Sequence, residues 1–137
     1  DMPRIFRQSP VNGVWEGSGN VMCLDALRAM IRSPESMEAF MVELDLAAGA
    51  DRRLDAAIAG VRKELGDIDD IESRARSVVE SMALAMQGSL LVRQGPPEVA
   101  DAFCASRLGE DGGRAFGTLP PEFNFAAIIE RNRPSTH

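Results

Sequence analysis

The chemistry that this sequence offers is concentrated at residues 15–20, Trp-Glu-Gly-Ser-Gly-Asn, where a carboxylate follows a large aromatic ring and precedes a glycine-rich turn. An apolar ring disfavours the charged form of a neighbouring carboxylate and raises its pKa toward that of a useful general base. A turn that opens a helix also leaves backbone N–H groups free to bind an anion. By pattern alone, a structured loop with a helix cap is the more common origin of such a segment, so both interpretations stay open here.

Glu16 stands out because the one histidine of the sequence is its last residue, His137. Catalytic triads, histidine zinc sites and imidazole acid–base catalysis therefore lack their central residue. Cys23 and Cys104 form no CxxC pair and are expected to be two reduced, buried side chains. We expect no metal site, and any proton transfer must use a carboxylate.

Two further groups of charged residues are expected to be structural. The acidic stretch at residues 67–72 lacks the ligand spacing and central glycine of a calcium loop, and acidic residues are favoured where a helix begins. Basic residues at 52–53, 62–63, 74 and 76 could form a phosphate-binding face. Each lies among acids, which favours a solvated helix surface of mixed charge.

Composition narrows the function classes further. The chain has 137 residues, a net charge of -6 and 45% hydrophobic residues, which is typical of one globular domain and disfavours nucleic acid as a partner. Its longest uncharged, mostly apolar run, Ser81 to Val92, is much shorter than the roughly 20 residues that span a membrane. The sequence begins at Asp1 with neither a methionine nor a signal-peptide pattern. We expect a cytoplasmic fragment of a longer protein.

Apolar residues recur at intervals of three and four through most of the chain, which predicts an all-α fold. The expected architecture is an antiparallel helical bundle of about five helices with one long central helix. Residues 1–20 show no such period and are predicted to be a loop, with residues 1–15 poorly ordered or held by a neighbouring chain. The predicted helices cover residues 21–33, 34–49, 51–66, about 25 residues from 68, and 99–109, followed by a loop at 109–121 and a short helix at 123–130.

Residues 4–20, Arg-Ile-Phe-Arg-Gln-Ser-Pro-Val-Asn-Gly-Val-Trp-Glu-Gly-Ser-Gly-Asn, closely resemble a segment of the acyl-CoA dehydrogenases. There an arginine–aromatic–arginine stretch leads through a short loop to an aromatic-Glu-Gly-Thr turn. With Val21–Arg28 following, the segment is similar to the AidB-type, adaptive-response branch. That branch has a helical C-terminal extension with a Gly-Gly-Arg stretch late in it, and Gly112-Gly113-Arg114 matches this stretch. The resemblance implies a C-terminal fragment: residues 1–33 would end the dehydrogenase C-terminal helical domain, and residues 34–137 would form the helical extension.

The resemblance implies an FAD-dependent oxidoreductase that removes two hydrogens from the α and β carbons of an acyl-CoA thioester. Glu16 matches the family's catalytic α-proton base, and its backbone N–H would help to polarise the thioester carbonyl. Trp15 and Gly17 match substrate-binding positions, with Trp15 replacing the usual tyrosine and narrowing the pocket. Ser18 and Asn20 match cofactor-binding positions on the adenine-nucleotide side of FAD, where most members have Thr and many have Gln.

The same resemblance implies partners. They are the rest of the parent chain, sister subunits of a homotetramer, an acyl-CoA substrate and an electron-transfer flavoprotein. The fragment alone lacks the domains that hold the flavin ring, so we expect it to be inactive. The alternative is a non-catalytic interaction or DNA-binding helical module of an AidB-type adaptive-response protein, against which the net charge of -6 counts.

Overall fold

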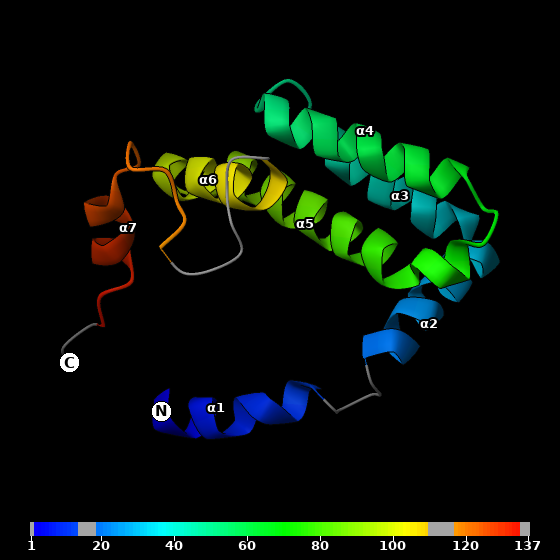
Figure 1. Cartoon of the computed structure of the whole chain (residues 1–137), viewed down its shortest axis with the longest axis horizontal. Coiled ribbons are helices and arrows are strands. Elements are labelled where there is room, and N and C mark those ends of the chain that lie inside the picture. The colour runs from blue at the N-terminus through cyan, green and yellow to red at the C-terminus, as the bar shows by residue number, and fades with distance from the viewer. Residues whose placement is uncertain (1, 14–18, 110–116, 135–137) are drawn as a thin grey trace.

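The computed structural model describes residues 2–13, 19–109 and 117–134. Within these ranges the chain forms helices and no strand, which confirms the predicted all-α class. The α-helices, shown in Figure 1, are α1 (Met2–Gln8), α2 (Gly19–Arg32), α3 (Pro34–Asp45), α4 (Arg52–Gly66), α5 (Ala75–Gln94), α6 (Pro97–Phe103) and α7 (Phe125–Arg131). Shorter helical turns cover Ser9–Gly13, Ile71–Arg74 and Cys104–Leu108.

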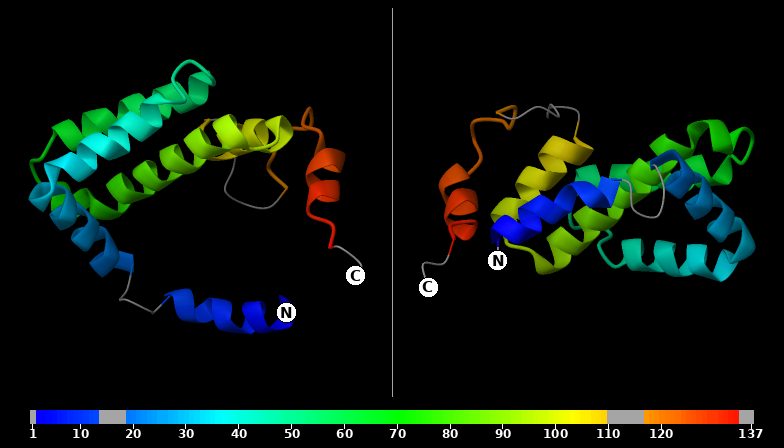
Figure 2. Two further views of the ribbon diagram at one scale, coloured as in Figure 1. Left: turned by 180° about the vertical axis from the view of Figure 1, so that it is seen from behind. Right: turned by 90° about the horizontal axis from the view of Figure 1, so that it is seen from below.

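Helix α5 is the central element, as predicted, and packs against α2, α3, α4 and α6 (Figures 1 and 2). Two buried clusters hold these helices together. The larger joins α3, α4, α5 and the turn after α6 through Leu44, Ala47, Leu54, Ile58, Val61, Ala85 and Cys104. The smaller joins α2 to the first half of α5 through Leu27, Ala75 and Val78. The contact between α2 and α5 positions the segment in which the sequence predicts chemistry.

Local signals set the ends of α3 and α4. Pro34 occupies the first turn of α3. Backbone N–H groups in this turn have no acceptor within the helix, so the lack of an N–H in proline costs no hydrogen bond. Gly49 has a φ of 78°, which a residue with a Cβ rarely adopts, so glycine lets the chain reverse between the two helices. Asp51 then accepts hydrogen bonds from the backbone N–H groups of Arg53 and Leu54 and caps α4. The start of α3 and both ends of α4 are where the sequence predicts them, whereas α3 ends at Asp45 rather than at the predicted Gly49, because residues 46–49 form turns.

The prediction of a loop over residues 1–20 is wrong, since α1 and the 3₁₀ turn Ser9–Gly13 fill most of its described part. Periodicity failed here because it detects a helix only when one face is buried, and residues 3–13 are all exposed. Pro3 in the first turn favours a helix without any buried face. The segment is regular, but it does not enter the core of its own chain.

The long helix also begins later than predicted, at Ala75 rather than Ile68. Asp70 has a φ of 51°, outside the helical region. The guanidinium of Arg74 donates to the backbone carbonyls of Asp67 and Asp69 at 2.7 and 3.2 Å. These bonds hold residues 67–70, before the 3₁₀ turn Ile71–Arg74, in a non-helical shape that the apolar period alone does not reveal.

Candidate functional site

The structure places one of the five predicted site residues. Asn20 lies in the first turn of α2 and is exposed. Trp15, Glu16, Gly17 and Ser18 lie outside the described residues, in the segment that joins the 3₁₀ turn after α1 to α2. Of the predicted site, the structure therefore describes the part that α2 contributes.

Asn20 opens onto a cleft of about 410 Å³ between the beginnings of α2 and α5. One wall is formed by Asn20 and Leu24 of α2, and the other by residues 72–77. That second wall contributes the carboxylate of Glu72, two arginines, two serine hydroxyls and the first turn of a 20-residue helix. The Ser73 hydroxyl and the Arg74 guanidinium already donate to backbone carbonyls of the preceding connection. The remaining donors, Arg76, Ser77 and the start of a long helix, suit a ligand with negatively charged oxygens.

Arg76 is the residue of this cleft whose role the sequence analysis missed. A Cβ built on Gly19 would lie 3.3 Å from Nη2 of Arg76, so glycine at this position leaves room for the guanidinium beside the start of α2. Arg76 is exposed and forms no ion pair with a carboxylate anywhere in the described ranges. Its guanidinium remains available to phosphate or carboxylate oxygens. Only the packing of α2 on α5 brings it to Asn20.

Other arginines are engaged by acids, as the sequence predicts for a surface of mixed charge. Arg74 lies 3.6 Å from the carboxylate of Asp67, and Arg93 donates to Glu43 at 2.5 Å. Arg28 pairs with Asp25, and Arg62 pairs with Asp45. These pairs neutralise four of the cations that a nucleic-acid surface would use. In the described part of the chain, no helix is long and apolar enough to cross a membrane, and no cluster of three metal-ligating side chains occurs.

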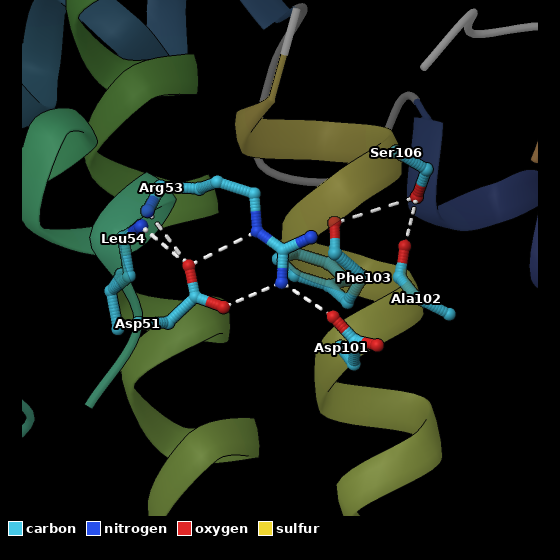
Figure 3. A network of polar contacts seen from close by, with 7 residues as sticks. All are labelled: Asp51, Arg53, Leu54, Asp101, Ala102, Phe103 and Ser106. Atoms are coloured by element: carbon cyan, nitrogen blue, oxygen red, sulfur yellow. Dashed lines mark hydrogen bonds and ion pairs between the residues drawn. The ribbon is translucent and has the colours of Figure 1, made fainter. Parts of the chain in front are cut away.

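The strongest polar network joins α4 to α6 and is shown in Figure 3. Nη2 of Arg53 donates to Oδ2 of Asp51 at 2.6 Å and to Oδ1 of Asp101 at 2.5 Å. The hydrogen bond from Arg53 lowers the pKa of Asp51 below its usual 3.8, and the two carboxylates raise the pKa of Arg53. The hydroxyl of Ser106 donates to the carbonyl of Ala102 at 2.8 Å, within the turn after α6. Because Arg53 is occupied on both sides, we assign this network to structure.

Asp51→Asn should lower the free energy of unfolding by about 1 to 2 kcal/mol near neutral pH, because it removes a charge-assisted hydrogen bond but keeps a good cap. The pKa of Asp51 is lowered in the folded state, so its contribution is full above the unfolded value of 3.8 and is lost as the pH falls through the folded value. Urea unfolding at neutral and acid pH should show the difference between variant and wild type shrinking below pH 3.8.

The matched control is Asp45→Asn, whose pair with Arg62 is about half exposed on both sides and should contribute less than about 1 kcal/mol. A difference between Asp51→Asn and wild type that stays constant into acid would contradict the role of the Asp51 charge.

The cysteines only partly follow the prediction. Both are free thiols, but Cys23 is half-buried while Cys104 is fully buried in the larger core cluster. Burial raises the pKa of the Cys104 thiol to about 11. It stays protonated at neutral pH and acts as a small apolar side chain.

The sequence is 31% identical over 113 residues to an Escherichia coli (strain K12) protein named "Putative acyl-CoA dehydrogenase AidB". The aligned region covers 82% of this chain and 20% of that relative, so the chain spans about one fifth of the length of the relative that it matches. No family model matches the sequence, and no solved structure matches it. Since the identity extends over most of the chain and agrees with the resemblance at residues 4–20, this chain belongs with the AidB-type proteins of the acyl-CoA dehydrogenase family, of which it matches a part.

Proposed function

We propose that this chain is the C-terminal part of an FAD-dependent, acyl-CoA dehydrogenase-type oxidoreductase. The observation that carries the proposal is the 31% identity, over 82% of the chain, to a protein named as a putative acyl-CoA dehydrogenase. The Trp-Glu-Gly-Ser-Gly-Asn turn at residues 15–20 supports it, because a carboxylate is the one side chain here suited to remove a proton from carbon. The chain would contribute this turn to a site completed by the rest of the longer protein.

The proposed domain division places residues 1–33 at the end of the dehydrogenase domain and residues 34–137 in the helical extension. Ser33 separates α2, which ends at Arg32, from α3, which begins at Pro34. Leu27 of α2 packs on Ala75 and Val78 of α5, which would fasten the extension to the dehydrogenase part. This contact would fix α2, and with it the turn that precedes α2.

The cleft beside Asn20 fits the phosphate-bearing part of FAD. Its donors are the Asn20 amide, the Ser77 hydroxyl and the guanidinium of Arg76, which has no ion pair within the described residues. We assign Ser18 and Asn20 to the adenine-nucleotide side of FAD and Arg76 to its phosphate oxygens. FAD, when bound, supplies the two-electron acceptor for the reaction.

Glu16 would take the α proton of the acyl-CoA thioester. Trp15 beside it would exclude water, disfavour the charged carboxylate and so make the carboxylate a stronger base. The backbone N–H of Glu16 would donate to the thioester carbonyl and stabilise the negative charge that develops on its oxygen. Trp15 and Gly17 would shape the acyl pocket, and the larger indole would favour narrower or shorter acyl groups than a tyrosine does.

The proposed partners follow from this role. They are the rest of the parent chain, sister subunits of a homotetramer and an electron-transfer flavoprotein that reoxidises the cofactor in the cytoplasm. None of them requires a basic surface on this part of the protein, in keeping with its net charge of -6.

The test is an anaerobic titration of the full-length protein that carries this chain with acyl-CoA thioesters of increasing chain length. We expect flavin absorbance to fall on addition of at least one thioester, with short or narrow chains most effective. Free fatty acids of the same lengths are the control, because they lack the activated α proton. If no thioester bleaches the flavin, the proposed dehydrogenation is wrong.

The isolated chain should not retain FAD through purification. It offers contacts to one side of the cofactor only, and binding energy that is spread over other domains cannot be recovered by this part alone. The absorbance spectrum of the purified chain measures this, with the full-length protein purified in the same way as its control. A near-stoichiometric flavin spectrum from the isolated chain would show that the site is more complete than we propose.

A further inference from the structure

Two opposite charges line the cleft beside Asn20 without pairing with each other. Glu72 and Arg76 both belong to its second wall, four residues apart in the sequence. Neither forms an ion pair with another described residue. The cleft therefore presents a carboxylate as well as a guanidinium, and a ligand that carries only negative charge would be repelled at Glu72.

The local backbone keeps the two charges apart. Glu72 lies in the 3₁₀ turn Ile71–Arg74, whereas Arg76 lies in the first turn of α5. A 3₁₀ helix has fewer residues per turn than an α-helix, so the two side chains lose the alignment that residues four apart have within one α-helix. Ser73 and Arg74 fix the turn, because both donate hydrogen bonds to backbone carbonyls of the preceding connection. The carboxylate is thus held on the wall of the cleft, separate from the guanidinium.

A ligand that satisfies both groups must offer negatively charged oxygens to Arg76 and hydrogen-bond donors to Glu72. The adenine-nucleotide part of FAD offers both, since its diphosphate is anionic and its ribose carries two adjacent hydroxyls. In dinucleotide-binding folds an acidic side chain accepts a hydrogen bond from a ribose hydroxyl in the same way. The cleft, at about 410 Å³, is within the usual range for small-molecule and cofactor pockets, and Leu24 adds an apolar contact.

We propose that Glu72 is the residue of this cleft that selects an unphosphorylated ribose. The inference rests on the proposed function, which assigns the adenine-nucleotide side of FAD to this cleft. The acyl-CoA substrate of the same reaction also contains adenosine diphosphate, but with a phosphate on the 3′ oxygen of its ribose. Glu72 would accept hydrogen bonds from the ribose hydroxyls of FAD and repel that phosphate, so the cleft would take the cofactor and reject the corresponding part of the substrate.

Competition for the emptied flavin site of the full-length protein that carries this chain tests the proposal. The protein is freed of FAD, and rebinding of FAD is followed by flavin fluorescence in the presence of ADP or of ADP that carries a 3′-phosphate. These two probes differ in that group alone. We expect ADP to compete at least about tenfold more tightly than its 3′-phosphate in the wild type, and Glu72→Gln to reduce this ratio to about threefold or less.

Two further variants serve as controls. Asp69→Asn removes an acidic charge three residues from Glu72, but Asp69 is not among the residues that line the cleft, so the ratio should stay that of the wild type. Arg76→Gln should weaken the binding of FAD and of both probes while keeping the ratio, because Arg76 would contact the 5′-diphosphate that all three share. All three side chains are exposed, so the variants should fold, which circular dichroism checks.

A ratio that Glu72→Gln leaves unchanged, or that Asp69→Asn lowers equally, would overturn the role of Glu72. The proposed function is judged separately, by flavin bleaching with thioesters. A protein that is bleached by a thioester but fails the competition test keeps the proposed function and loses only the selection by Glu72. A protein that binds no FAD, or whose FAD binding is unchanged by Arg76→Gln, would show that this cleft is not the cofactor site and would overturn the selection as well.

Discussion

Glu16→Gln, in the full-length protein that carries this chain, is expected to slow acyl-CoA-dependent flavin reduction by about 100- to 10,000-fold while leaving flavin content nearly unchanged. The amide has the shape of the carboxylate, so folding and cofactor binding should be kept. It cannot accept the α proton, so the chemical step should be lost. Stopped-flow measurement of flavin absorbance under anaerobic conditions, at saturating thioester, gives the rate directly.

Ser18→Ala is the matched comparison for the Glu16 substitution. It removes a proposed cofactor contact and leaves Glu16 in place. It should therefore weaken FAD retention and have less effect on the reduction rate when FAD is saturating. Undiminished flavin reduction in the Glu16→Gln protein would rule out Glu16 as the base and leave the turn as a structured loop.

The helices that the sequence predicts well are those whose ends carry their own signals. Pro34 begins α3, Asp51 caps α4, and Gly66 ends it, and each signal acts through backbone chemistry within a few residues. The two largest errors have a different cause. Helix α1 has no buried face, so its sequence shows no helical spacing of apolar residues. Helix α5 begins later than predicted because Arg74 donates hydrogen bonds to carbonyls of the preceding connection.

The candidate site likewise has a part that the sequence predicts and a part that it does not. The turn at residues 15–20 could be predicted because its chemistry is contiguous in the sequence. Arg76 could not be assigned to it, since its approach to Gly19 depends on Leu27 of α2 packing against Val78 of α5. Glu72 is a similar case, because the cleft that it lines exists only where α2 lies beside the start of α5. Properties that depend on which helix faces lie together have no local signature.

Leu54→Ala should give a large loss of stability, about 2 to 5 kcal/mol. Leu54 is fully buried in the first turn of α4, within the cluster that joins α3, α4 and α5. Deleting its side chain removes apolar contacts and leaves a void, against a total stability of about 5 to 15 kcal/mol for a domain. Urea unfolding followed by circular dichroism measures the loss, and Leu46→Ala, at an exposed position, should change it by less than about 0.5 kcal/mol.

Gly88 of α5 provides an internal test of that packing. A Cβ at this position would lie 3.1 Å from Cδ1 of Leu54 and 3.0 Å from Cδ1 of Leu108, so Gly88→Ala alone should crowd both leucines and offset its gain in helix propensity of about 1 kcal/mol. In the Leu54→Ala background one of these contacts is gone, and the new methyl group enters the space left by the leucine. The double variant should therefore lose less stability than the sum of the two single changes, by about 0.5 to 3 kcal/mol. Strict additivity in this double-mutant cycle would mean that Leu54 and Gly88 do not share a packed contact, and the packing of α4 on α5 described here would be wrong at its centre.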